Sequence, residues 1–206
     1  MTKLLFPLSG ALLLILTSCS EQPQTAARKE PEKAAEPVTG QSALWKMYQA
    51  ARSWAPDAQV LKLNSIRLAE VPQVPGKAAA WQATFTSDAK SRARSYTYSV
   101  IESAANLHKD VFAGLEEGWS GPHGSSAPFL IAAVKIDTDA AYQTALGNGG
   151  SDYDKKDPGK TITLLLEKTT KFPDPAWRVI WGESAGTANF SVYVDASTGG
   201  FLEKMH

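Results

Sequence analysis

Trp177–Gly182 (WRVIWG) and Phe190–Asp195 (FSVYVD) are the stretches that decide the fold. Each mixes aromatic and branched residues with polar ones, which is typical of antiparallel strands that have one face in the core. The segment between them contains glycine and is short enough for a hairpin loop. Thr161–Glu167 before them and Phe201–Lys204 after them have the same character, so we expect an antiparallel meander.

A helix is predicted directly before this meander. Thr138–Leu146 (TDAAYQTAL) forms it, Asp137 can cap it, and Asp139 lies in its first turn, where a negative charge is favourable. Gly147–Gly150 (GNGG) is expected to end it. A helix followed by antiparallel strands indicates a domain of the α+β class.

The same order of patterns occurs earlier in the chain. Ala43–Ala51 is an amphipathic helix, with Leu44, Met47, Tyr48 and Ala51 on one face. The strands predicted after this helix are Val60–Ala69, Trp81–Thr86 and Arg94–Ile101.

Aligning Trp81 with Trp177 suggests an internal duplication of one unit. The same offset places Ala80–Phe85 on Ala176–Trp181 and Ser65–Leu68 on Thr161–Leu164. Chance similarity between two meanders is the alternative. We therefore expect an α+β fold with two tandem units, each one helix packed on an antiparallel β-meander. The predicted units are residues 42–113 and 129–206, joined by a linker at 114–128 that holds four glycines and two prolines.

The second unit resembles a PepSY domain. The resemblance rests on the Trp-led strand Pro175–Trp181, on Phe190–Phe201 with its Val-Asp-Ala ending and Thr-Gly turn, and on the helix opener Asp137–Ala141. It covers residues 136–204, and the first unit departs from it at Glu102–Asn106. PepSY domains are small α+β units of protease propeptides and exported bacterial proteins. The resemblance implies peptidase inhibition or another protein-binding role and brings no catalytic residues.

The N-terminus indicates export and lipid anchoring. Leu4–Thr17 is apolar but too short to span a bilayer, as in a signal peptide, predicted here for residues 1–18. Leu16–Cys19 resembles the bacterial lipobox, which implies that Cys19 is diacylated and becomes the new N-terminus. A secretory signal with an incidental Cys19 is the alternative. The residue after Cys19 is Ser20 and not Asp, and the resemblance to sorted lipoproteins of two-membrane bacteria then implies the outer membrane, facing the periplasm.

Residues 19–41 are expected to be a lipid-anchored, disordered tether. Glu21–Gln41 has no aromatic residue, contains three prolines and mixes both signs of charge, so it cannot bury enough surface to fold. A flexible chain of this length spans about 25 Å.

Composition excludes several classes of protein. The 206 residues carry 21 Lys+Arg against 21 Asp+Glu, so no net charge attracts a nucleic acid, and none is expected as a partner. A single Cys excludes a disulfide scaffold.

Gly182–Gly186 matches the G-x-S-x-G motif of esterases, with Ser184 as the nucleophile. A strand and not a helix is predicted to follow Ser184, so we interpret the motif as a hairpin loop and expect no catalytic residue. Asp152–Asp157 offers three carboxylates, but Lys155 and Lys156 oppose a cation there, and a solvated loop is expected. His108, His123 and His206 are far apart, so neither a metal nor a cofactor is predicted.

Trp45, Trp81 and Trp177 are predicted core residues. Trp119 lies in the linker outside any periodic pattern, which makes it a candidate partner contact, with packing between the two units as the alternative. Lys90, Arg92 and Arg94 form a basic strip, interpreted as protection of an edge strand, with a phosphate site as the alternative.

The sequence thus predicts an envelope lipoprotein, anchored to the membrane at Cys19, that binds a protein or peptide without catalysis or modulates a peptidase. A structural or assembly protein of the envelope that pairs through its sheets is the alternative.

Overall fold

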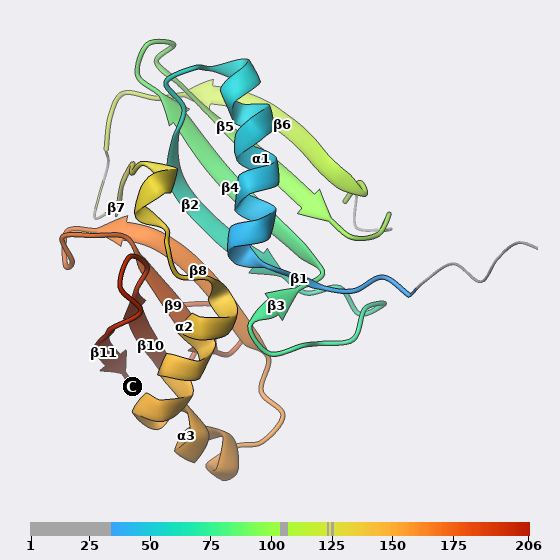
Figure 1. Cartoon of the computed structure of the whole chain (residues 1–206), viewed down its shortest axis with the longest axis vertical. Helices are drawn as coiled ribbons and strands as arrows, with labels where there is room; N and C mark the ends of the chain where they lie inside the picture. The colour runs from blue at the N-terminus through green and yellow to red at the C-terminus, as the bar shows by residue number, and fades with distance from the viewer. Residues whose placement is uncertain (1–33, 104–106, 123, 125) are drawn as a thin grey trace, which may run out of the picture. The chain divides into compact units, whose positions relative to one another are not determined.

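One antiparallel sheet runs through the described part of the chain in the computed structural model (Figure 1). The structure describes residues 34–103, 107–122, 124 and 126–206. The strand order is β11 (Phe201–Met205), β10 (Phe190–Asp195), β9 (Ala176–Trp181), β8 (Ile162–Thr169), β2 (Gln59–Ile66), β4 (Ala80–Ser87), β5 (Arg92–Ser99) and β6 (Asp110–Gly118). The α+β class is therefore confirmed.

Two short pairings lie beside this order. β7 (Ser126–Ala127) pairs with β8, and β1 (Val38–Thr39) forms a separate two-stranded ribbon with β3 (Lys77–Ala78). We refer to residues 38–118 as the first half and to residues 131–206 as the second half.

The helices lie on one face of the sheet (Figure 1). In the first half α1 (Gly40–Trp54) packs on β2, β4 and β5. In the second half α2 (Thr138–Ala145) packs on β9 and β10. Both helices have an apolar stripe of helical period, so their burial against the sheet follows from the sequence.

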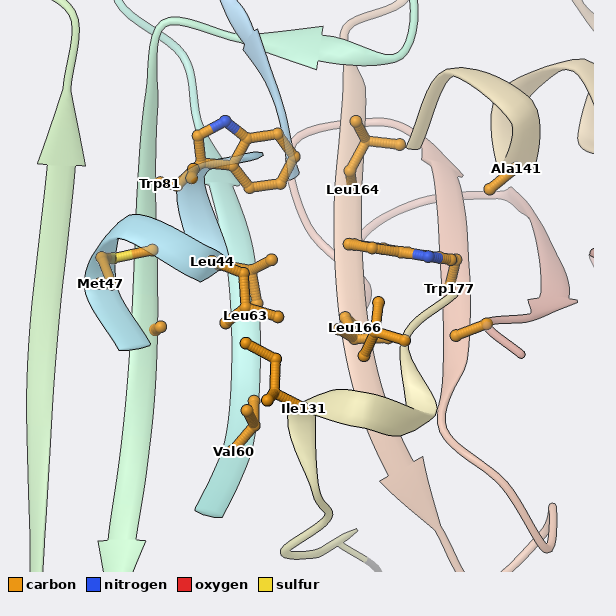
Figure 2. Packing of buried hydrophobic residues seen from close by; sticks show 14 of the residues in the cluster. Leu44, Met47, Val60, Leu63, Trp81, Ile131, Ala141, Leu164, Leu166 and Trp177 are labelled. Atoms are coloured by element: carbon orange, nitrogen blue, oxygen red, sulfur yellow. The ribbon is translucent and has the colours of Figure 1, made fainter. Parts of the chain in front are cut away.

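A single hydrophobic core joins the two halves. Figure 2 shows Leu44 and Met47 of α1 on one side and Leu166 and Trp177 on the other, with Leu63 and Ile131 between them. All six of these side chains are buried. Because residues of both halves share one cluster, the halves are expected to unfold together.

The seam between the halves is the antiparallel pair β2–β8. Lys62 pairs with Glu167, Leu63 with Leu166 and Asn64 with Leu165. This pairing converts two meanders into one sheet, and no sequence pattern predicted it.

Trp81 and Trp177 occupy matching places in the two halves. Both are fully buried, as predicted. The indole Nε1 of Trp81 donates to the carbonyl of Val38 (3.2 Å), and that of Trp177 donates to the carbonyl of Ile136 (2.8 Å). Each carbonyl belongs to the second residue before a helix. Each tryptophan thus fixes its sheet strand to the start of a helix.

The predicted alignment of the strands before these tryptophans is wrong. Ser65 lies opposite Trp81, whereas Leu166 lies opposite Trp177. The counterpart of Ser65 is therefore Leu166, and Thr161, which the alignment gave, precedes β8. A duplication itself stays a prediction.

The first half has a strand that the sequence did not predict. β6 continues through Gly114–Gly118, which the predicted linker included. It pairs with β5, so β5 is an interior strand. The interpretation of Lys90, Arg92 and Arg94 as protection of an edge strand is therefore wrong.

Gly147–Gly150 ends α2 but does not end the helical segment. The chain kinks there, with Gly149 at a φ of 111°, and then continues into α3 (Ser151–Lys156). Asp152–Asp157, predicted as a loop, is mostly this short helix.

Residues 1–33, with the predicted signal peptide, Cys19 and most of the tether, lie outside the described residues. The predicted end of the tether at residue 41 is wrong, because Val38 packs against the core in β1 and α1 already begins at Gly40. Within the described part of the chain, no helix combines the length and the apolar character that crossing a membrane requires.

Candidate functional site

A pocket of about 280 Å³ lies where the first half meets the second. One wall is the turn at residues 73–77, between β2 and β4. The other walls come from α2, α3 and the beginning of β8. The lining residues are Gln73, Val74, Pro75, Gly76, Lys77, Tyr142, Asp154, Gly159, Lys160, Ile162 and Leu164. Pockets between packed units are common ligand sites.

Tyr142, which is buried, and Asp154, which is half-buried, supply polar groups to this pocket. The Tyr142 side chain is only 7% exposed, and its ring stacks on Trp181 with centroids 6.2 Å apart. Asp154 Oδ1 accepts a hydrogen bond of 2.6 Å from Trp181 Nε1. Burial raises the pKa of the Tyr142 hydroxyl, and the charge of Asp154 raises it further. Trp181 therefore positions both polar groups.

Neither group is fully used by the protein. Within the described residues the Tyr142 hydroxyl makes no hydrogen bond, and Asp154 makes one, through Oδ1. The pocket thus offers a hydroxyl and a carboxylate oxygen to a ligand.

Two cations line the same pocket, Lys77 at the start of β3 and Lys160 in the loop before β8. The Lys160 ammonium lies 3.0 Å from the Asp157 carboxylate, and that hydrogen bond raises the pKa of Lys160. Lys77 forms no ion pair with any described residue. Val74, Pro75 and Ile162 supply apolar surface. The site therefore combines one free cation, one carboxylate and an aliphatic wall.

Gly76 allows the turn to approach α2 closely. Its φ is 74°, and a Cβ there would lie 2.6 Å from the Cα of Asp139. The carbonyl of Gly76 accepts a hydrogen bond of 2.5 Å from Thr138 Oγ1. A side chain at residue 76 would therefore push the two walls of the pocket apart.

Next to the contact of Gly76 with Thr138, the N-termini of α1 and α2 meet and share a capping residue. Asp137 Oδ1 accepts from the amide of Thr138 at 2.7 Å, which confirms the predicted cap, and also from the amide of Gln41 at 2.9 Å. The amide of Gly40 donates to Thr138 Oγ1 at 2.9 Å. Residues of the second half thus cap helices of both halves.

The two edges of the sheet are a second candidate surface. On β6, Leu115 is 86% exposed and Phe112 is 47% exposed. On β11, Phe201 and Met205 are 44% and 38% exposed. Among the described residues each of these strands pairs on one side only. Free backbone groups beside exposed apolar side chains favour pairing with another strand.

Trp119, the predicted partner contact, lies at the β4–β5 hairpin. Its indole Nε1 donates to Asp88 Oδ1 (2.9 Å), its amide donates to the carbonyl of Ser91 (3.0 Å), and the side chain is half-buried. Trp45, predicted in the core, is 44% exposed. That prediction is wrong because Trp45 lies beside the stripe of Leu44 and Met47 and not within it.

Ser184 lies in the hairpin loop between β9 and β10, and this loop has the form that the sequence predicted. The hydroxyls of Ser184 and Thr187 are 2.8 Å apart. In the part of the chain that the structure covers, no group of three or more His, Cys, Asp or Glu residues is placed to hold a metal. His108 bonds Glu102, His206 lies near Phe190, and His123, like Cys19, is outside the described residues.

Tyr142, Asp154 and Lys77 are binding candidates that the sequence did not indicate. In the sequence, Asp154 is a candidate only for binding a cation, and Tyr142 is one more apolar position of a helix. Their meeting depends on the β2–β8 seam, for which the sequence gives no signal.

Comparisons with known proteins give one structural match. No family model matches the chain, and no curated protein matches it. A solved structure of a candidate lipoprotein from Clostridium difficile 630 is similar, with a TM-score of 0.46 and 10% sequence identity. The match covers 84% of this chain and 95% of that one.

Proposed function

We propose that this chain is an envelope protein, lipid-anchored at Cys19, that binds an extended segment of a protein partner along β6 and does not act by catalysis. The supporting observation is the β6 edge, where Leu115 is 86% exposed beside backbone groups that pair with no described strand. An added strand would gain main-chain hydrogen bonds and would cover Leu115 and Phe112.

The charges of β6 indicate what kind of segment it would accept. Asp110, Glu116 and Glu117 make this edge acidic. Glu116 already accepts from Trp54 Nε1 at 2.8 Å and lies 3.8 Å from Arg94, whereas Glu117 is exposed. A second copy of β6 would bring like charges together, which is unfavourable in a sheet. A partner segment that carries apolar and basic residues fits better.

The N-terminal part of the sequence supports the location of this binding. A lipid at Cys19 and a tether of about 25 Å would hold the sheet close to the membrane and leave it free to meet a partner. The PepSY resemblance supports a protein partner, and a peptidase is the partner class that it suggests. Placement on the outer membrane rests on Ser20 alone.

A photo-crosslinking amino acid at position 115 tests the proposal in cells. We expect a covalent adduct with one partner at Leu115 and no adduct at Leu130, a control position that is 64% exposed but lies off both edge strands. A Phe112→Lys change should reduce the adduct at position 115. Equal crosslinking at positions 115 and 130 would contradict binding along β6.

The anchor is tested separately. Cys19→Ala should release the protein from the membrane fraction or leave it unprocessed, because the acceptor thiol is gone. Equal detergent partitioning and normal processing of both forms would show that Cys19 carries no lipid.

A second candidate function is assembly through both edges of the sheet. It is favoured by Phe201 and Met205, which make β11 an exposed edge as well. Chains that joined β6 to β11 would form longer sheets, so an adduct between positions 115 and 203 of two copies would support assembly over capture of a different protein.

A further inference from the structure

The pocket where the first half meets the second contains polar groups that the proposed binding along β6 does not use. At one place the Tyr142 hydroxyl and the Asp154 carboxylate offer oxygen atoms, and the aromatic ring of Trp181 backs them. The Tyr142 hydroxyl has no hydrogen-bond partner among the described residues. These groups suit a ligand that donates several hydrogen bonds and is positively charged, such as a primary ammonium group.

The lysines of the same pocket select a second group on the ligand. Lys77 has no ion-pair partner among the described residues, and Lys160 lies beside Asp157. A ligand with only a cation would meet repulsion from Lys77. A ligand with a carboxylate as well would balance both charges of the site.

Volume and wall chemistry limit the remainder of the ligand. A pocket of about 280 Å³ holds a small molecule and not a folded partner. Val74, Pro75, Ile162 and Leu164 line it with aliphatic surface. The third group of the ligand should therefore be apolar and small.

We propose that the pocket formed by residues 73–77, Tyr142, Asp154 and Lys160 binds a small zwitterion of the α-amino-acid class with an aliphatic side chain. The ammonium group lies against Tyr142 and Asp154, the carboxylate against Lys77, and the side chain against Val74 and Ile162. This site is independent of β6, so either proposal can fail alone.

Calorimetry with the full chain and L-leucine is the test, with leucinamide and N-acetyl-leucine as arms that lack one charge each. We expect L-leucine to bind, N-acetyl-leucine not to bind, and leucinamide to bind about tenfold more weakly. A short leucine peptide is a further arm. It shows whether the site takes a free amino acid or the charged terminus of a peptide.

Three variants assign the contacts. Asp154→Asn should weaken L-leucine binding about tenfold or more, while its amide oxygen can still accept from Trp181. Tyr142→Phe keeps the stacking on Trp181 and should cost several-fold in affinity, and Lys77→Gln should weaken L-leucine but not leucinamide. Asp152→Asn is the matched control, because Asp152 is on α3 but does not line this pocket.

The proposal is overturned if no aliphatic amino acid binds, if N-acetyl-leucine binds as well as L-leucine, or if Asp152→Asn weakens binding as much as Asp154→Asn. Melting of each variant in the absence of ligand shows whether a lost affinity reflects a lost fold.

Discussion

The two halves of the molecule share a frame but differ in how their helices begin. In the second half Asp137 caps its own helix α2. In the first half Thr39 stands at the N-cap of α1 but makes no side-chain cap, and the amides of Gly40 and Gln41 bond to Thr138 and Asp137 of the second half. The second half therefore caps its own helix, whereas the first half depends on the second half for the cap of α1.

This difference shows that a matching order of elements does not make two halves equally independent. Trp81 and Trp177 anchor their strands in the same way, yet the helix starts that they fix differ in the source of their caps. We expect the first half to depend on the second more than the reverse. Four predictions test this comparison, from the largest effect to the smallest.

Trp81→Ala and Trp177→Ala should each lower the free energy of unfolding by about 3–5 kcal/mol, because each removes a fully buried indole and leaves a cavity. Both should act on one transition, since the core is shared. Urea denaturation followed by fluorescence and circular dichroism measures this. Trp45→Ala, at a 44% exposed position, should cost far less. Two separate transitions would show that the halves unfold independently.

Gly40→Ala should destabilise the protein by about 1–3 kcal/mol through overpacking. The added methyl would lie 2.7 Å from Thr138 Cγ2 and 2.8 Å from the Trp177 ring, both of the second half. Gly147→Ala meets no atom within 4 Å and serves as the control in thermal melts. If both variants melt like the natural protein, the helix starts do not meet as closely as described.

Asp137→Ala should cost about 1–2 kcal/mol, because one carboxylate caps two helix starts. Thr39→Ala should cost almost nothing, since Thr39 makes no side-chain cap. Hydrogen exchange should show the amides at the start of α1 opening in the first variant and not in the second. The reverse order of effects would mean that the first half caps its own helix.

The halves should also differ in acid. Asp57 and Glu102 are the described carboxyls whose pKa is lowered, and both belong to the first half. A hydrogen bond of 2.6 Å from the Ser87 hydroxyl is the main cause at Asp57, and the amide of Ala89 adds to it. A lowered folded-state pKa stabilises the fold above the ordinary value of 3.8, and this contribution is lost as the pH falls below it.

Ser87→Ala should therefore make stability slightly less dependent on pH in that acid range, as chemical denaturation at several pH values would show. Ser184→Ala, in a loop of the second half, is the control. If stability depends on pH in acid as strongly in Ser87→Ala as in the natural protein, the hydrogen bond between Ser87 and Asp57 is not the cause of that dependence.

Much of the fold can be predicted from the sequence because its core strands alternate clearly. Trp177, Val179 and Trp181 point to one face of β9, as their spacing indicates, and all three are buried. The Asp137 cap is also readable, since a capping residue and its helix are adjacent in the chain. These features depend on local sequence, where backbone preference and burial agree.

The unpredicted features depend on contacts between distant residues or on weak alternation. β6 contains glycine and acidic residues and is half-exposed, so no period-two pattern marks it. Leu63 pairs with Leu166, but the apolar strands of the two halves are so similar that the sequence does not show which of them are neighbours. The pocket combines Lys77 with Asp154, and no spacing in the sequence relates them.

The β2–β8 seam has a consequence for how fast the sheet can form. The other neighbouring strands of the main sheet are joined by short connections, whereas Lys62 and Glu167 are separated by roughly 100 residues of chain. Closing such a long loop costs entropy before any contact compensates for it, so a sheet with its least local pair at the centre should fold slowly. Both meanders would then expose the seam edges of β2 and β8 until they meet. This interval is when the chain is most vulnerable to aggregation.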